Sequence, residues 1–210
     1  MDAAPVSHQS DDVQLLARAQ AGALAAFDEL VLRYQQEVFA VAMRMLGDQD
    51  EAKDVSQDVF VRAYQGIHSF KGEAKLSTWL VSITMNLCRN RRRWWARRRR
   101  LIAASLDEPV GRARHGLGEE WVGEEGALGH DVADPSPTPA MAAERSEQQQ
   151  QLMALLLRLD EADREVIVLR DIQGHSYEEI AGMLGCRLGT VKSRLNRARL
   201  RLRALLDGRP

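Results

Sequence analysis

The sequence is poor in cysteine and lacks long apolar segments, and each shortage excludes a class of protein. Cys88 and Cys186 are the two cysteines among 210 residues, and neither belongs to a Cys-x-x-Cys pair or a Cys/His cluster. A disulfide framework and a zinc site are therefore not expected, and we predict neither a metal nor another cofactor. The longest apolar runs, at 38–43 and 152–157, have six residues each. Because a membrane-spanning helix needs roughly 20 apolar residues, no membrane insertion is expected.

Aromatic residues are also scarce, at 5% of the chain, which argues against a β-sandwich rich in strand formers. The first five residues, Met1-Asp-Ala-Ala-Pro5, lack the basic start and apolar run of a signal peptide. Together with the isolated cysteines, this predicts a protein of the reducing cytoplasm.

Net charge is nearly absent, at −1, but the charges are unevenly distributed. Residues 89–100 contain eight arginines and no acid, and residues 185–210 have a local charge of +7. Residues 107–144, between them, have a local charge of −7. Only four of the 29 basic residues are lysines, and arginine favours planar recognition of phosphates and base edges. Two separated basic surfaces suggest two contacts along one polyanion, most simply a nucleic acid.

Apolar residues recur at helical spacing on both sides of an irregular middle segment. Residues 27–45 and 76–94 each have an apolar stripe with a period near 3.6, a helix is also predicted over 50–64, and Gly47-Asp48 separates it from the first. A similar pattern resumes near Glu144, with a helix expected over 160–172 and ended by Gly174. Strand-like alternation is absent. The sequence predicts an all-α protein with a loose tail (1–10), a helical domain (11–102), a linker (103–143) and a second helical domain (144–208).

The predicted linker contains four of the six prolines and six glycines, and it has no sustained apolar period. This composition is typical of a flexible connection, here an acidic one. Because the linker has the opposite charge to the basic segments, we also hypothesise that the free protein folds back on itself and binds DNA poorly.

The C-terminal segment has helix-turn-helix spacing. Tyr177, Ile180 and Leu184 lie on one face of a short helix that opens with a Ser176/Glu179 capping box. A turn at 185–187 follows, and then a second helix with Val191 and Leu195 on its buried side. Small and hydrogen-bonding residues on the opposite side suit the major groove of DNA, with arginine and asparagine reading base edges. The residues expected to contact DNA are Arg187, Gly189, Thr190, Lys192, Ser193, Arg194, Asn196 and Arg197.

The helix predicted over 76–95 combines an apolar stripe with a basic end. Its spacing predicts that Thr78, Ser82, Met85, Arg89 and Arg92 face outward, with Asn86 and Asn90 on one flank. Trp79 and Trp94 lie on the apolar stripe, whereas Trp95 lies about 100° away from it. We interpret Trp79 as a core residue and Trp95 as a residue that stacks on bases of single-stranded or melted DNA.

The helix predicted over 50–64 carries Asp54 and Asp58 four residues apart, with Gln57 between them and Phe60 beyond. Grouped carboxylates sometimes form a metal or acid/base site. No histidine lies among them, however, and acids along one helix face do not converge on a point. A protein-docking face is the favoured interpretation, with a plain solvated face as the alternative.

Three segments, taken together and in this order, resemble the bacterial sigma factors of the extracytoplasmic-function (ECF) group. They are Asp54-Val-Ser-Gln-Asp-Val-Phe60, Leu76-Ser-Thr-Trp79 with Asn86, and Ser176-Tyr-Glu-Glu-Ile-Ala181 with Gly189-Thr-Val-Lys-Ser-Arg194. The resemblance implies a sigma region 2 helical bundle, a sigma region 4 helix-turn-helix domain and an acidic linker that threads into the polymerase. It also implies binding to core RNA polymerase, to promoter DNA and to an anti-sigma factor.

The resemblance further implies a role for each segment. Asp54, Gln57, Asp58 and Phe60 would bind core polymerase, and the loop at 69–75 would capture a flipped base. The C-terminal helix would read the minus-thirty-five element. The residues expected at the minus-ten element and the opened strand are Phe70, Lys71, Lys75, Asn86, Arg89, Asn90, Arg93 and Trp95.

Two other functions fit parts of the sequence. A conventional helix-turn-helix regulator acting without core polymerase would need a dimer interface or a phosphoacceptor α/β domain, and neither pattern is present. A nuclease using Asp54 and Asp58 with Mg²⁺ would need a second element to close the site. The sequence therefore predicts an initiation factor rather than an enzyme.

Overall fold

The computed structural model of the chain describes residues 9–106 and 150–207. These residues form helices and no strand, which confirms the predicted all-α class. The predicted tail and linker lie mostly outside the described residues. The elements are α1 (Gln9–Gln20), α2 (Leu24–Leu46), α3 (Gln49–Gly66), η1 (Ile67–Ser69), α4 (Leu76–Leu106), the helical segment 150–158, α6 (Glu161–Ile167), the π-helical turn η2 (Val168–Ile172), α7 (Tyr177–Leu184) and α8 (Leu188–Leu206).

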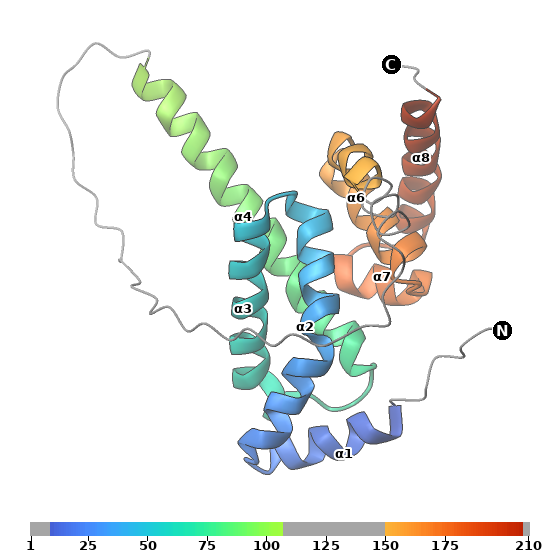
Figure 1. Ribbon diagram of the computed structural model, residues 1–210. Coiled ribbons are helices and arrows are strands. Elements are labelled where there is room, and N and C mark those ends of the chain that lie inside the picture. Colours follow the sequence, from blue (N-terminus) through green and yellow to red (C-terminus); the bar gives the residue numbers. More distant parts are fainter. Residues whose placement is uncertain (1–8, 107–149, 208–210) are drawn as a thin grey trace, which may run out of the picture.

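Helices α1 to α4 form an N-terminal bundle in which α2 packs against the other three (Figure 1). The apolar stripe of α2 supplies the core, with Leu30, Val38, Val41 and Met45 buried. Gly47 ends α2 in the left-handed conformation, at φ 74°, which glycine adopts without strain. Asp48 then caps α3, because its carboxylate accepts a hydrogen bond from the Glu51 backbone amide at 2.9 Å. The break predicted at Gly47-Asp48 is confirmed.

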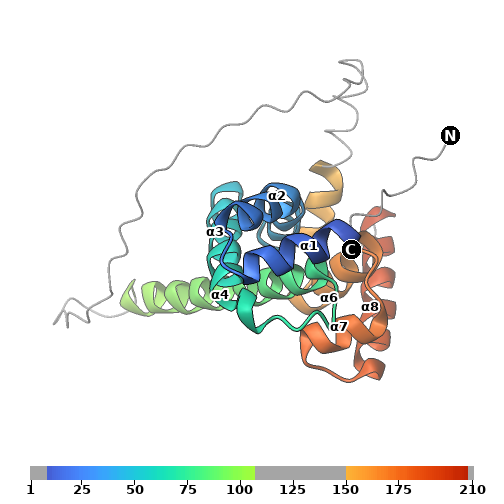
Figure 2. The same cartoon turned by 90° about the horizontal axis from the view of Figure 1, so that it is seen from below.

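Helix α4 is much longer than its bundle partners. Its N-terminal half packs against α2 and α3, while its C-terminal half extends away from the bundle (Figure 2). It continues to Leu106, four residues into the predicted linker.

The C-terminal domain consists of segment 150–158, α6, η2, α7 and α8, with α8 packed on both α6 and α7. The helix expected over 160–172 is confirmed, although its second half is a π-helical turn, in which the Gln173 amide donates to the Val168 carbonyl at 3.0 Å. Gly174, at φ 76°, ends it as expected. In the part of the chain that the structure describes, no helix is both long and apolar enough to span a membrane.

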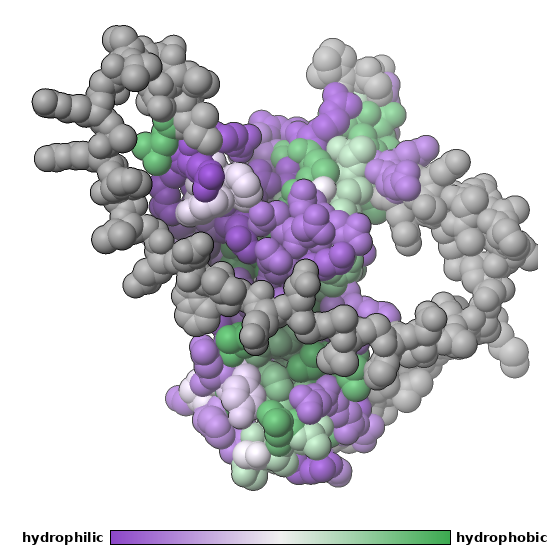
Figure 3. Space-filling model, turned by 60° about the vertical axis from the view of Figure 1, so that its left-hand side comes forward, coloured by the Kyte–Doolittle hydropathy of each residue, from purple (hydrophilic) through white to green (hydrophobic). Residues whose placement is uncertain are grey.

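The surface differs between the two ends of the molecule. In the face drawn in Figure 3, hydrophilic side chains dominate the upper part, and apolar patches are more frequent in the lower part. Exposed apolar side chains of α2 and α3 include Leu24, Val61 and Tyr64.

Candidate nucleic-acid interface

The basic half of α4 presents a row of solvent-accessible arginines with two tryptophans among them. Trp94 and Trp95 are 42% and 38% exposed and contact each other edge to face, with ring centroids 4.9 Å apart. The Arg98 guanidinium lies 5.2 Å from the Trp94 ring centroid. Exposed aromatic faces beside arginines provide surfaces on which unpaired bases stack.

The residues predicted to contact the minus-ten element lie in two groups along α4 and the loop before it. Lys71 and Lys75 are exposed in the loop, and Asn86, Asn90 and Arg93 are exposed on the helix. Phe70 is half-buried against Trp79, with ring centroids 4.9 Å apart.

Arg89 differs from these residues, because its side chain forms an ion pair with Glu165 of α6. Only 17% of the Arg89 side chain is exposed. It is therefore engaged by the second domain in this structure, and contact with DNA requires that this ion pair break.

The outward face predicted for the first half of α4 is wrong at Met85 and Thr78. Met85 is fully buried and Thr78 is 6% exposed. At Thr78 the cause is a second packing partner, because α7 packs on α4 and the Thr78 hydroxyl is 3.3 Å from a Glu179 carboxylate oxygen. Trp94, which lies on the predicted apolar stripe, is not buried but 42% exposed.

The acidic face predicted on α3 is accessible. Asp54, Gln57 and Asp58 are exposed, and Phe60 is half-buried. Arg91 of α4 lies 3.0 Å from Glu51 and 3.6 Å from Asp54, so one arginine of the basic row is paired with this face. Within 9–106 and 150–207, no group of acids, histidines and cysteines is arranged to hold a metal ion.

An apolar groove of about 320 Å³ adjoins this acidic face. Phe60 contributes to it, together with the exposed Leu24, Val61 and Tyr64. These three residues were not predicted, because single exposed apolar residues are common on helix surfaces and do not by themselves indicate a binding site.

Local sequence builds the helix-turn-helix as predicted. Ser176 and Glu179 form the reciprocal capping box at the start of α7, and Gly185 ends that helix at φ 60°. Val191, Leu195 and Ala198 bury one side of α8. On the rest of its surface, Thr190 and Arg194 are half-buried, and the exposed predicted residues are Arg187, Gly189, Lys192, Ser193, Asn196 and Arg197.

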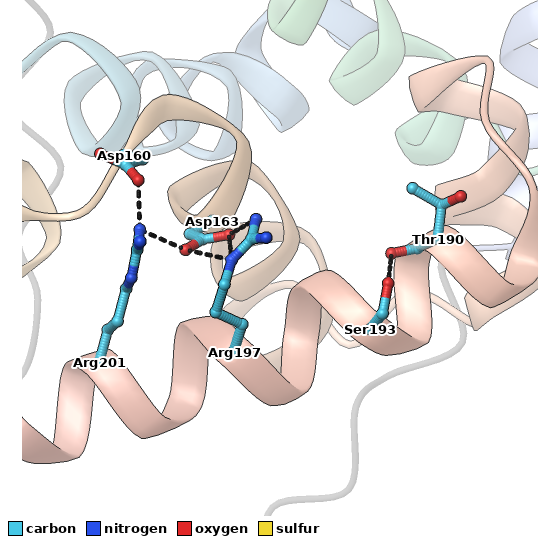
Figure 4. Close-up of polar contacts among 6 residues, drawn as sticks. All are labelled: Asp160, Asp163, Thr190, Ser193, Arg197 and Arg201. Carbon is cyan, nitrogen blue, oxygen red and sulfur yellow. Dashed lines mark hydrogen bonds and ion pairs between the residues drawn. The ribbon is translucent and has the colours of Figure 1, made fainter.

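Three arginines of α8 are held by aspartates that precede it in the chain, and Figure 4 shows two of them, Arg197 and Arg201. Arg197 contacts both oxygens of Asp163, with nitrogen–oxygen distances of 2.7 to 3.2 Å, and Arg201 contacts Asp163 at 3.0 Å and also Asp160. Arg199 pairs with Asp171 at 3.0 Å. The hydrogen bonds from Arg197 to Asp163 raise the pKa of that guanidinium. The pairing of these aspartates with α8 was not predicted from the sequence, because the partners lie 28 to 41 residues apart along the chain and no local pattern connects them.

Arg164 joins the two domains from a buried position. It donates to the carbonyls of Leu156, Leu157 and Leu159 at the end of segment 150–158, and to the Met45 carbonyl near the end of α2. Burial lowers the pKa of Arg164 to about 10. Since helix C-termini carry unpaired carbonyls and partial negative charge, one guanidinium stabilises two helix ends from different domains.

Arg92 donates to the same Met45 carbonyl at 3.1 Å. The side chains around this contact line a cleft of about 870 Å³ between the domains, which includes Trp95, Arg93 and Glu161. Trp95, predicted to stack on bases, therefore borders the space between the two halves.

Known families match both halves of the chain. The sigma-70 region 2 family matches residues 30–100, and the sigma-70 region 4 family matches residues 149–202. The RNA polymerase sigma-H factor of Pseudomonas aeruginosa is 34% identical over 192 residues, which cover 91% of each chain. The ECF RNA polymerase sigma-E factor of Escherichia coli K12 is 34% identical over 92% of this chain and 93% of its own.

Two solved structures have a similar arrangement of helices. CnrH in complex with the cytosolic domain of CnrY gives a TM-score of 0.60 at 29% identity, covering 94% of this chain and 97% of CnrH. The sigma factor RpoE of Bartonella quintana, in complex with the anti-sigma factor NepR, gives 0.57 at 27% identity, covering 86% of this chain and 96% of RpoE. With an acidic α3, a basic α4 and a helix-turn-helix in place, these matches show that the chain belongs to the ECF group of the sigma-70 family of RNA polymerase sigma factors.

Proposed function

We propose that this chain binds core RNA polymerase in the cytoplasm and directs it to promoters, contacting the minus-ten element with α4 and the minus-thirty-five element with α8. The observation that carries the proposal is the family match over both halves of the chain, with the basic surfaces of α4 and α8 in the matched segments. Its role is that of an initiation factor without a catalytic reaction of its own.

Docking on core polymerase uses the acidic face of α3. Asp54, Gln57 and Asp58 supply accessible polar contacts, and Phe60 leads into the apolar groove that contains Leu24, Val61 and Tyr64. Apolar side chains beside a charged rim are typical of protein interfaces.

At the minus-ten element, the loop with Phe70, Lys71 and Lys75 receives an extruded base. Because extrusion costs a few kcal/mol, contacts along the opened strand must offset it. The exposed Asn86, Asn90, Arg93 and Trp95 are placed along α4 to make them, and Arg89 joins them after its ion pair with Glu165 breaks.

At the minus-thirty-five element, the N-terminal half of α8 enters the major groove. Gly189, Thr190, Ser193 and Asn196 approach the bases, and Arg187, Lys192 and Arg194 contact bases or phosphates. In the described residues, Arg187 and Arg194 have no acidic partner, whereas Arg197 is held by Asp163.

An anti-sigma factor is the proposed regulator. In one of the similar structures, the sigma factor RpoE of Bartonella quintana is bound to the anti-sigma factor NepR. No residue of this chain identifies the partner.

Run-off transcription with purified core polymerase separates the possible functions. A sigma factor confers promoter-specific initiation on core enzyme, whereas a conventional helix-turn-helix regulator binds DNA but initiates nothing. Initiation at random positions, equal with and without this chain, would contradict the proposal.

We further expect charge reversal of Asp54 and Asp58 to lysine to abolish co-purification with core polymerase, because two attractive contacts become repulsive. Reversal of Glu178 and Asp207, two exposed acids of the C-terminal domain, is the matched control and should leave co-purification unchanged. If polymerase still co-purifies with the Asp54 and Asp58 variant at the wild-type yield, docking uses another surface.

A further inference from the structure

We propose that Asp163 is a specificity-determining residue for promoter recognition, because its buried carboxylate holds Arg197 and Arg201 on α6 and withholds two guanidinium groups from the DNA backbone. The inference rests on the proposed function of α8 at the minus-thirty-five element. It predicts that loss of this one carboxylate strengthens binding to every DNA sequence and weakens discrimination among them.

Asp163 holds the two arginine side chains in a fixed geometry. Asp163 is fully buried, in the first turn of α6, while the side chains of Arg197 and Arg201 are 54% and 47% exposed. Arg197 donates from Nε and Nη2 to the two carboxylate oxygens, and Arg201 Nη1 lies 3.0 Å from Oδ2 (Figure 4). Bidentate pairing of this kind fixes the direction of a guanidinium as well as its distance.

The clamped arginines lie beside the surface that is proposed to enter DNA. At about 100° per residue, Arg197 is displaced by about 40° around α8 from Ser193, and Arg201 by about 80°. Ser193 is exposed and its hydroxyl donates to the Thr190 carbonyl. An arginine side chain that is released from α6 at these positions has DNA phosphates within its reach.

Neutralising Asp163 releases Arg197 and leaves Arg201 with Asp160 alone, an exposed pair that a DNA phosphate can replace, and the cost to the fold is small. Removal of one partner from a buried ion pair is destabilising when it leaves the other charge buried. Here the remaining charges are about half exposed, so water solvates them. In Asp163→Asn the amide keeps the shape of the side chain and one acceptor oxygen.

The pair formed by Arg199 and Asp171 provides a matched control. Arg199 has a similar exposure, 51%, and a similar pairing geometry. It lies about 120° from Ser193 in the opposite direction around the helix, on the same flank as Lys192. Asp171→Asn therefore removes the same charge and releases one arginine on the other flank of α8, which shows whether the effect belongs to Asp163 or follows from any released arginine of α8.

The test uses the full chain in complex with core polymerase. An upstream duplex is first selected by the wild-type holoenzyme from a library with randomised sequence, and a scrambled version of it serves as non-specific DNA. Affinity for both duplexes is then measured over a range of salt concentrations. The variants are Asp163→Asn, Asp171→Asn, Arg197→Gln, and Asp163→Asn combined with Arg197→Gln and Arg201→Gln.

For Asp163→Asn we expect tighter binding to the scrambled duplex, and a slope of log K against log salt that is steeper by about two, at about 0.9 per added phosphate contact. The ratio of selected to scrambled affinity should fall by roughly threefold or more. Arg197→Gln should keep the wild-type slope, and Asp171→Asn, which releases a single arginine, should steepen it by no more than about one. The triple variant should return to the wild-type slope, because it has no released arginine. If Asp163→Asn acted only by disturbing α6, the triple variant would keep the altered slope.

A wild-type slope and ratio in Asp163→Asn, or a slope that stays steep in the triple variant, would overturn the inference. Arg197→Gln tests it without any change in α6, because a shallower slope in this variant would show that Arg197 already contacts DNA. If the wild-type holoenzyme selects no upstream element at all, the proposed function itself fails, which is a separate result.

Discussion

At the scale of single residues, the arginines of α8 differ in whether an aspartate holds them. Arg194 is half-buried and has no acidic partner in the described residues, whereas Arg197 shares Asp163 with Arg201. We expect Arg194→Ala to lower affinity for the upstream element by about tenfold, the effect of losing one base or phosphate contact of about 1–3 kcal/mol. Arg197→Ala should change this affinity much less.

Affinity for an upstream duplex and co-purification with core polymerase are the two measurements for these variants. Core binding should be intact in both, because α8 lies far along the chain from the α3 docking face and does not pack on it. Equal loss of DNA binding and core binding in Arg194→Ala would indicate general misfolding and would count against the assignment.

His175 is a second residue with a measurable consequence, because it is buried at the junction of the domains. Its Nδ1 is 3.9 Å from Glu179 of α7, Lys75 approaches it from the loop before α4, and Arg170 donates to its backbone carbonyl. Its buried Nε2 has no hydrogen-bond partner. Burial, aided by Lys75 and opposed by Glu179, lowers the pKa of His175 below its usual 6.5.

The lowered pKa gives stability a defined dependence on pH. Between the folded and unfolded pKa values the unfolded chain binds more protons, so the free energy of unfolding falls as the pH drops below about 6.5. The pKa of Glu179 is also lowered, mainly by its hydrogen bond with the Ser176 backbone, and its contribution is lost only at more acid pH. Urea unfolding of His175→Gln should show a flatter profile between about pH 7 and pH 5 than wild type. The exposed His68, changed to Gln, should leave the profile as it is.

At the scale of elements, boundaries set by neighbouring residues could be predicted from the sequence. The Ser176 capping box, the Gly47 break and the Gly174 and Gly185 turns were all predicted, because each depends on residues within one or two turns. Burial on α4 could not be predicted in the same way. Its apolar period locates the side that faces α2 and α3, but it gives no sign that α7 packs on α4 at Thr78 or that Met85 is buried.

The capping box makes a quantitative prediction for α7. The Ser176 hydroxyl accepts from the Glu179 amide at 3.1 Å, and the Glu179 carboxylate accepts from the Ser176 amide at 2.8 Å. Ser176→Ala should lower the free energy of unfolding by about 1 kcal/mol, measured by denaturant unfolding. Ser193→Ala, which removes a hydroxyl bonded inside α8, should cost clearly less. Equal losses of unfolding free energy in the two variants would mean that the capping box stabilises the fold no more than the hydrogen bond inside α8.

At the scale of the whole molecule, the contacts between the two domains explain why only part of the site could be predicted. Arg164 binds backbone carbonyls of both domains, and no sequence pattern marks which carbonyls an arginine will reach. The contact between the domains also requires a small residue at position 47, because a Cβ atom on Gly47 would lie 2.5 Å from the Leu157 side chain. The hypothesis that the free chain folds back was based on the acidic linker, most of which lies outside the described residues, and that linker role stays a prediction. The described polar contacts between the domains include Arg89 with Glu165, Arg92 with Glu161, Thr78 with Glu179, and Arg164 with the Met45 carbonyl.

These contacts place one residue in two competing interactions. Arg89 binds Glu165 in this structure and is proposed to bind the opened strand on the promoter, and it cannot do both at once. Glu165→Gln should therefore free Arg89, loosen the domain contact and raise affinity for a single-stranded minus-ten oligonucleotide. Small-angle scattering should show a larger radius of gyration for the variant. Glu178→Gln, the same change on the exposed surface of α7, is the control. Unchanged scattering together with unchanged single-strand affinity would mean that the Arg89–Glu165 pair neither holds the domains together nor restrains DNA binding.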